Sequence, residues 1–227
     1  MAERALDEAG IEQLVDVLVD AEALRFGDLI TKSGRPTPYF VNFGQVRTGA
    51  QLAALAECYA DGVERVFGSG VDLLFGPAYK GIPLAVATSL ALQRRGVDVG
   101  FAFDRKEAKD HGEGGTIVGM QPRDGDRIVI LEDVTTAGTS LRESVPLLRG
   151  AADVEVVGVL VGIDRLEHAD EPTETALDGI GRTLGVRVAA LATIEDVASR
   201  LHGRSLGDED LARIRSHLER YGARPLS

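Results

Sequence analysis

Apolar residues recur along this chain with two different periods, and these periods outline its secondary structure. Recurrence every three to four residues places side chains on one face of a helix and predicts amphipathic helices. The segments with this spacing are 8–25, 50–67, 82–95, 141–148 and 208–221, with another helix from about residue 193. Short apolar runs rich in β-branched residues predict strands. These runs cover 26–31, 39–43, 71–75, 97–103, 116–120, 128–131, 154–163 and 186–191.

The order of these elements indicates an α/β fold. Strands and helices alternate over residues 71–163, which is typical of a mainly parallel sheet flanked by helices. Residues 33–38 contain a glycine and two prolines and predict a loop between the first two strands. Residues 166–182 are polar, so we expect a surface excursion and assign no function to it. No repeat or linker interrupts the pattern, which predicts a single domain over residues 1–227.

Composition narrows the classes of protein that the chain can belong to. Of its 227 residues, 44% are apolar and 27% charged, the balance of a soluble globular protein. No apolar run approaches the ~20 residues of a membrane span, and the N-terminus carries acids where a signal peptide would carry basic residues. The single cysteine, Cys58, lies in a helical pattern and is expected in the core. We therefore expect a cytoplasmic protein.

Charge argues against nucleic acid and acidic membranes as partners, because the net charge is −11. Only four lysines are present, against 21 arginines: Lys32, Lys80, Lys106 and Lys109. All four fall in stretches that other arguments single out as functional. Chance clustering is the alternative, yet the pattern favours a local positive site within an acidic protein.

The most informative stretch is IVILEDVTTAGTS, residues 128–140. A buried strand leads into two carboxylates, Glu132 and Asp133, then into a small hydroxyl-rich loop and the start of a helix. Backbone N–H groups in such a loop, with the helix dipole, bind anions. Because carboxylates repel phosphate, Glu132 and Asp133 suit sugar hydroxyls or a metal ion. The stretch predicts a ribose-5-phosphate site; the alternative is an ordinary strand–turn–helix connection with solvated acids.

Two further loops have features of an anion site. The loop GPAYKGIP, residues 76–83, again joins a strand to a helix through small residues. Residues 104–115, DRKEAKDHGEGG, combine cationic groups with three hinge glycines and predict a mobile charged loop. A solvated turn between hairpin strands is the alternative for the second loop.

These motifs resemble those of a known family. Residues 128–140 resemble the phosphoribosyl-pyrophosphate (PRPP) signature of the type I phosphoribosyltransferases. RKEAKDHGEGG closely resembles the catalytic loop of the orotate phosphoribosyltransferases within that family, and TKSGRPTPYFVNFG (31–44) resembles their N-terminal hood. The resemblance implies the family's α/β fold, with a hood over residues 1–45 plus C-terminal elements and a core over about 50–192.

The resemblance also implies roles for individual residues. It places PRPP against the acids and the loop after them: Glu132, Asp133, Val134, Thr135, Thr136, Ala137, Gly138, Thr139 and Ser140. It adds Lys32, Tyr79, Lys80, Arg105, Lys106, Lys109 and His111 to the PRPP contacts, with Lys80, Lys106, Lys109 and His111 catalytic at the pyrophosphate. It assigns orotate to Lys32, Phe40, Val41, Thr136 and Arg165. The alternative for Arg165 is a surface pair with Asp164 or Glu167.

The implied reaction is orotate plus PRPP giving orotidine 5′-monophosphate and pyrophosphate, in pyrimidine biosynthesis. The implied cofactor is Mg²⁺, held through PRPP and water with Asp133 nearby. The implied assembly is a homodimer with shared active sites. Two alternatives stay open: a phosphoribosyltransferase for another base, such as hypoxanthine or uracil, and a PRPP-sensing regulator without catalysis. Arg165 and the hood argue against the first, and the intact lysine loop argues against the second.

Overall fold

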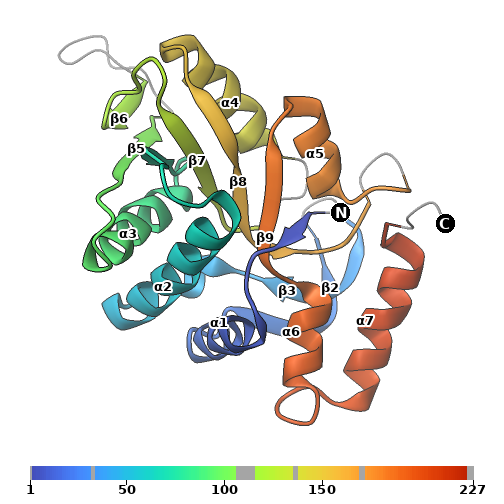
Figure 1. Cartoon of the computed structure of the whole chain (residues 1–227). Helices are drawn as coiled ribbons and strands as arrows, with labels where there is room; N and C mark the ends of the chain where they lie inside the picture. The colour runs from blue at the N-terminus through green and yellow to red at the C-terminus, as the bar shows by residue number, and fades with distance from the viewer. Residues whose placement is uncertain (1, 32–33, 106–115, 135–137, 169–171, 224–227) are drawn as a thin grey trace.

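The computed structural model describes residues 2–31, 34–105, 116–134, 138–168 and 172–223. Its centre is a sheet of the described strands in the order β1-β9-β8-β7-β4-β5-β6 (Figure 1). Strand β6 runs antiparallel to β5, and the other neighbouring strands run parallel. The strands are β1 (Glu3–Arg4), β4 (Leu73–Phe75), β5 (Gly100–Asp104), β6 (Ile117–Gly119), β7 (Arg127–Glu132), β8 (Glu155–Asp164) and β9 (Arg187–Thr193). The predicted mainly parallel α/β sheet is confirmed.

Helices cover both faces of this sheet, as the continuous apolar runs of its strands require. The core on one face is shared with α1 (Glu8–Asp20), α2 (Gly49–Phe67), α3 (Gly81–Arg94) and α6 (Ile194–Leu201). The core on the other face is shared with α4 (Thr139–Ala151) and α5 (Ala176–Leu184). Successive residues of β7 alternate between the two cores: Val129 and Leu131 face one, Ile128 and Ile130 the other.

The order of the strands creates a switch point beside β7. From β4 the chain passes through α3 to β5, on one side, and from β7 it passes through α4 to β8, on the other. Since β4 and β7 are parallel neighbours, the loops at their carboxyl ends diverge from a common position. Open α/β sheets bind their ligands in the crevice at such a point. The fold therefore places the loops after Phe75 and Glu132 side by side.

A smaller antiparallel hairpin lies in the predicted hood, where β2 (Leu24–Ile30) pairs with β3 (Pro36–Val41); this hairpin is called the hood below. The short helix η1 (Phe43–Gln45) follows it, and α7 (Asp208–Tyr221) packs against β3 (Figure 1). Tyr39, Val41 and Phe43 belong to the same apolar core as α1 and α2. The hood is therefore fixed to the main sheet by a shared core.

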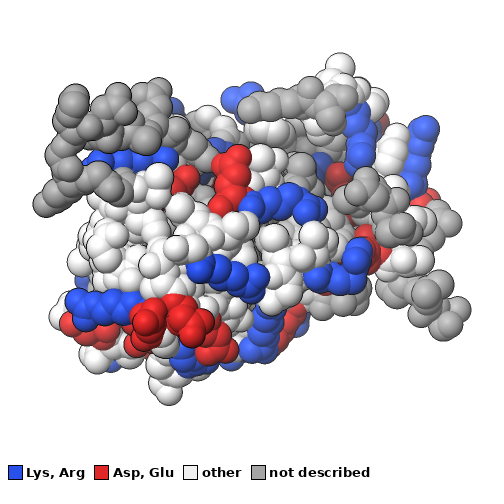
Figure 2. All heavy atoms as spheres, turned by 90° about the horizontal axis from the view of Figure 1, so that it is seen from above, with Lys and Arg blue, Asp and Glu red and all other residues white. Residues whose placement is uncertain are grey.

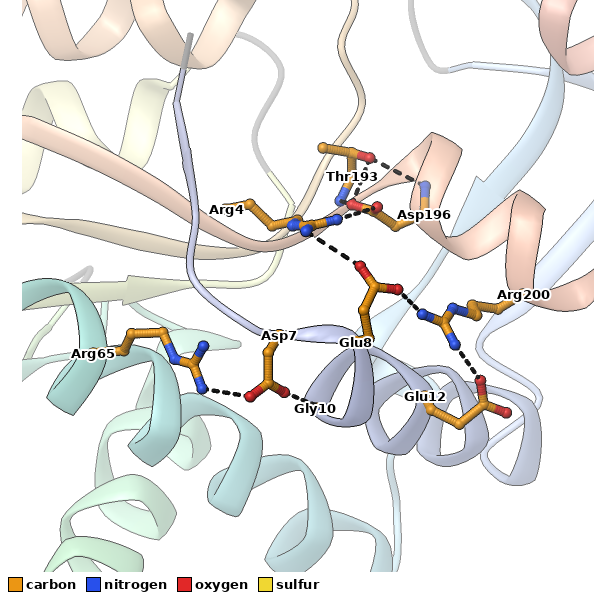
Figure 3. A network of polar contacts seen from close by, with 9 residues as sticks. All are labelled: Arg4, Asp7, Glu8, Gly10, Glu12, Arg65, Thr193, Asp196 and Arg200. Carbon is orange, nitrogen blue, oxygen red and sulfur yellow. Dashed lines mark hydrogen bonds and ion pairs between the residues drawn. The ribbon is translucent and has the colours of Figure 1, made fainter.

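Ion pairs join the N-terminal segment to α6 and α2 (Figure 3). Arg4 contacts Asp196 at 3.0 Å and Glu8 at 3.3 Å. Arg200 of α6 contacts Glu8 and Glu12, and Arg65 of α2 contacts Asp7 at 2.7 Å. Exposed pairs of this kind each contribute only ~0–1 kcal/mol. Their main consequence is to orient α1 against the two helices beside it.

Several sequence-based boundaries need correction. The predicted surface excursion at 166–182 is wrong, because Leu177 and Ile180 of α5 lie in the core and Glu167 is buried. The predicted loop at 33–38 is too long, since β3 already begins at Pro36. Helix α1 ends at Asp20 rather than residue 25, where the chain turns into β2. Helix α7 has the predicted bounds. Among the described residues, no helix is long and apolar enough to cross a bilayer.

Candidate active site

The two acids of the β7 motif lie buried at the carboxyl end of the central strand. Their backbone is fixed by neighbours: the Tyr59 hydroxyl donates to the Glu132 carbonyl at 2.7 Å, and Gly162 N–H donates to the Asp133 carbonyl at 2.7 Å. The Ser140 hydroxyl donates to the Glu132 carboxylate at 2.5 Å. The acids are therefore held before any ligand arrives, which is the preorganisation that a binding site needs.

The buried position of Glu132 disfavours the charged form of its carboxyl group. Burial, helped by the neighbouring Asp133 charge, raises the pKa of its carboxyl to about 7, although the Ser140 hydrogen bond acts to lower it. Bringing sugar hydroxyls or a cation to this point would favour the charged carboxylate. Glu132 is thus a group whose environment is incomplete without a polar ligand.

The loop after β4 approaches the acids from the adjacent strand. Lys80 Nζ lies 2.6 Å from the Asp133 Oδ2 atom, so the structure joins two predicted site residues from different motifs. The Asp133 side chain is buried while that of Lys80 is about half exposed, 52%. The Lys80 charge can therefore turn from Asp133 toward an anion without leaving its own helix terminus.

Close backbone packing shapes this loop. A Cβ atom at Gly76 would lie 2.0 Å from the Gly81 carbonyl oxygen, so only glycine fits there. Ala78 N–H donates to the Asp104 carboxylate at 2.6 Å, and the peptide bond between Ala78 and Tyr79 is cis. Tyr79 itself is 73% exposed. Asp104 was not predicted as a site residue, although its place at a strand end directly before Arg105 could have indicated it.

Two helices begin after the carboxyl ends of the neighbouring strands β4 and β7. Helix α3 begins after Lys80 and α4 after Gly138, and neither N-cap residue makes a side-chain capping bond within the described residues. Gly138 has a left-handed backbone (φ 64°), and a Cβ there would lie 2.4 Å from Ile180 Cδ1. First-turn N–H groups at such termini suit phosphate oxygens. The two termini lie in the segments predicted to bind the phosphate and the pyrophosphate, and that binding stays a prediction.

The predicted base-binding residues lie in β3 and after β8. Phe40 is 42% exposed, whereas the Val41 side chain is buried in the core, so only its backbone is available to a ligand. Arg165 is buried and its Nη2 atom lies 2.5 Å from Glu167 Oε1. The pairing with Glu167 that formed the alternative for Arg165 is present, but it is buried rather than on the surface.

Other predicted site residues lie outside the described part of the chain: Lys32, Lys106, Lys109, His111, Thr135, Thr136 and Ala137. Arg105 is described, and its N–H donates to the Thr116 carbonyl at 2.8 Å. This bond brings together the two ends of the predicted catalytic loop. Val134, Thr139 and Ser140 lie on either side of the undescribed part of the PRPP loop.

The donor set suits a metal shared with a ligand. Among the described residues, no group of three histidine, cysteine or acidic side chains is placed to hold a metal ion. The Glu132 and Asp133 carboxylates supply hard oxygen donors, and Mg²⁺ is commonly held by one or two carboxylates together with substrate phosphates. The residues present therefore fit Mg²⁺ that arrives with a phosphorylated ligand.

Comparison with known proteins agrees with this geometry. The profile of the phosphoribosyl transferase domain matches residues 46–192. Orotate phosphoribosyltransferases from Clostridium beijerinckii and Lachnoclostridium phytofermentans are 41% and 42% identical, covering 94% and 93% of this chain and 98% and 96% of their own. The crystal structure of the Francisella tularensis enzyme of that name superposes with a TM-score of 0.77 at 34% identity. That match covers 92% of this chain and 98% of the other.

Proposed function

The chain belongs to the orotate phosphoribosyltransferase family, and from that premise we propose that it transfers 5-phosphoribosyl from PRPP to orotate at the crevice beside β7. The products are orotidine 5′-monophosphate and pyrophosphate, in the pyrimidine pathway. The bond from ribose C1 to pyrophosphate breaks as the bond to the base nitrogen forms, and that nitrogen loses its proton. The observation that carries the proposal is the Lys80–Asp133 contact at 2.6 Å. It joins the two predicted anion-binding loops, after β4 and β7, at the switch point of the sheet.

Each part of PRPP has a matching group in the crevice. Glu132 and Asp133 accept hydrogen bonds from the ribose hydroxyls, and the N-terminus of α4 takes the 5′-phosphate. The N-terminus of α3 and Lys80 take the pyrophosphate. When pyrophosphate binds, Lys80 exchanges its bond to Asp133 for bonds to the leaving group. A cation placed there stabilises the negative charge that grows in the transition state.

The loop between Arg105 and Thr116 completes the site in this proposal. Lys106, Lys109 and His111 contact the pyrophosphate with Arg105, and closure of the loop excludes water from the reactive sugar. Mg²⁺, when bound, neutralises pyrophosphate charge and orients its oxygens. Asp133 and Glu132 are the residues that would hold it, directly or through water.

Recognition of the base falls to the hood and to the end of β8. Phe40 offers an exposed aromatic face, and Arg165 offers a planar guanidinium that matches the orotate carboxylate. Lys32 and Thr136 complete the base contacts. Uracil lacks that carboxylate and hypoxanthine has a different shape, so Arg165 is the residue that distinguishes orotate from the bases of the alternative reactions.

The acting species in this proposal is a homodimer whose loop reaches the neighbouring site. Support comes from apolar side chains left exposed on α3, β5 and the loops beside them: Tyr79, Leu90, Val97 and Phe101.

Acidic and basic side chains are interspersed on the face seen in Figure 2, with no continuous basic area among its described residues. Small-molecule substrates, rather than nucleic acid, suit this surface, and the cytoplasm stays the expected location.

Orotate consumption, followed by ultraviolet absorbance with PRPP and Mg²⁺, tests the proposed reaction. The purified protein should consume orotate and leave uracil and hypoxanthine unchanged. Consumption of another base would support the other-base alternative. Binding of PRPP without any turnover would support the regulator.

A further inference from the structure

Glu167 contacts the side chains of four residues from three different parts of the fold. Its Oε1 atom lies 2.5 Å from Arg165 Nη2, 2.8 Å from the Tyr39 hydroxyl and 2.9 Å from His217 Nε2. Its Oε2 atom lies 3.2 Å from Arg35 Nη1. We call these five residues the Glu167 cluster. They come from the hood, the end of β8 and α7, and the sequence separates them by up to 182 positions.

Apart from the partly exposed Arg35 the cluster is buried, and the Glu167 carboxylate is stabilised in its charged form. Burial alone would raise the Glu167 pKa, but hydrogen bonds from His217 and Tyr39 and the charge of Arg165 outweigh it and lower the pKa to about 2. Removing one partner from a buried charged pair leaves the other without compensation, which is costly. Glu167 is therefore the acceptor around which the cluster is assembled.

The guanidinium of Arg165 is bonded to this cluster through one of its nitrogens only. All its hydrogen bonds within the described residues run from Nη2, to Glu167 and, at 3.4 Å, to the Thr37 hydroxyl. The Tyr39 ring lies under the guanidinium, 4.5 Å from its central carbon. The Nε atom is buried and has no hydrogen-bond partner in the described structure. Buried donors without a partner are rare in native proteins, and an acceptor on a bound ligand would satisfy this one.

Helix α7 is tied to this arrangement at its C-terminal end. His217 and Ile214 are the buried residues of this helix, and the His217 ring packs edge-on against the Tyr39 ring with 5.7 Å between centroids. Backbone bonds run from His168 N–H to the Tyr221 carbonyl and from Ala223 N–H to the Leu166 carbonyl, both 2.9 Å. The end of α7 thus contacts the residues on either side of Glu167.

We propose that Glu167 is the positioning residue for base recognition, and that α7, through His217, is part of the device that orients Arg165 toward the carboxylate of the base. This inference rests on the proposed function, since it assigns the remaining N–H groups of the Arg165 guanidinium to the orotate carboxylate. Glu167 fixes Nη2 and the plane of the guanidinium, so the remaining N–H groups point in one direction. Without Glu167, the arginine loses the acceptor that orients it, and Tyr39 and His217 lose the acceptor that they share.

The test compares Michaelis constants for the two substrates in the full-length protein. Glu167→Gln, nearly isosteric, should raise the KM for orotate by about tenfold or more and leave the KM for PRPP within about twofold. Glu174→Gln is the matched control, because Glu174 also pairs with an arginine, Arg182, but lies outside the cluster. It should leave both constants unchanged.

Two substitutions at His217 separate positioning from packing. His217→Gln keeps an N–H donor at similar reach and should retain a nearly normal KM for orotate. His217→Leu removes the donor and should raise the orotate KM several-fold. If Glu167→Gln changes neither constant, or raises both equally, the inference is overturned. The same holds if His217→Gln and His217→Leu lower the melting temperature without changing the orotate KM. Failure of the wild-type protein to use orotate would instead overturn the proposed function.

Discussion

At the scale of single residues, two buried carboxyl groups differ in how well the fold stabilises their charged form. Glu132 is buried beside Asp133, and its raised pKa shows that the native state prefers its protonated form. A group of this kind contributes stability below its unfolded pKa of 4.5, and that contribution is lost as pH rises through about 7. Glu167 is the opposite case, since its partners keep it charged.

Replacing Glu132 by Gln should therefore stabilise the free protein at pH 8 while weakening PRPP binding. The neutral amide avoids the charge next to Asp133 and can still accept from Ser140. Thermal unfolding at pH 8 and pH 5, with calorimetric titration of PRPP and Mg²⁺, measures both effects. The melting temperature should rise at pH 8 and change less at pH 5; a lower melting temperature at pH 8 would contradict the assigned preference for the protonated form.

The stability supplied by Glu167 has the opposite dependence on pH. Its lowered pKa means that its contribution is fully present above the unfolded pKa of 4.5 and is lost as pH falls toward about 2. The shift corresponds to about 3 kcal/mol. Urea unfolding of wild type and Glu167→Gln should give a large difference at pH 6 that narrows at pH 3. A difference independent of pH would show that the carboxylate charge does not stabilise the cluster.

At the scale of elements, close contacts explain why the loops carry glycine. Gly138 has the left-handed backbone that begins α4, and the side chain of Ile180 occupies the space next to it. Gly150, in the same helix, has open space where a Cβ would go. The pair offers a comparison in which the added methyl group is the same but the backbone conformation and the surroundings differ.

Gly138→Ala should destabilise the protein by about 1–3 kcal/mol, from backbone strain and overpacking, and should weaken PRPP binding. Gly150→Ala should be neutral or stabilise by up to about 1 kcal/mol. Adding Ile180→Ala to Gly138→Ala should recover part of the PRPP affinity, because it removes the atoms nearest the new methyl group. Denaturant unfolding and calorimetry measure these effects; equal behaviour of the two alanine variants would contradict the steric argument.

Much of this level could be predicted from sequence, because it depends on local pattern. The period of apolar residues predicted α7 with its observed bounds, and the β7 motif predicted a buried strand that leads through two acids to a helix start. The contact between Lys80 and Asp133 could not be predicted from local pattern alone, because it depends on β4 and β7 being neighbours in the sheet. The burial of Glu167 could not be predicted locally, because its partners Tyr39 and His217 are 128 and 50 positions away.

At the scale of the whole molecule, the proposed shared site predicts complementation between inactive variants. Lys109→Ala removes a loop charge, and Asp133→Asn removes an acceptor in the crevice, so each should lower turnover by a factor on the order of 10² to 10³. Mixing the two proteins should form heterodimers in which one site has an intact crevice and receives an intact loop. Activity should then recover in part. Sedimentation confirms the dimer and subunit exchange; exchange without recovery would contradict a shared site.

The central claim is that one crevice holds PRPP at the end of β7 and the base at Arg165. Dissociation constants of both substrates, measured for Arg165→Ala and Asp133→Asn, test it most directly. Arg165→Ala should cost about 2–5 kcal/mol of orotate binding, because the carboxylate loses its desolvated partner, and should leave PRPP binding nearly unchanged. Asp133→Asn should weaken PRPP. A loss confined to PRPP in the Arg165 variant, or unchanged PRPP binding in the Asp133 variant, would contradict the account.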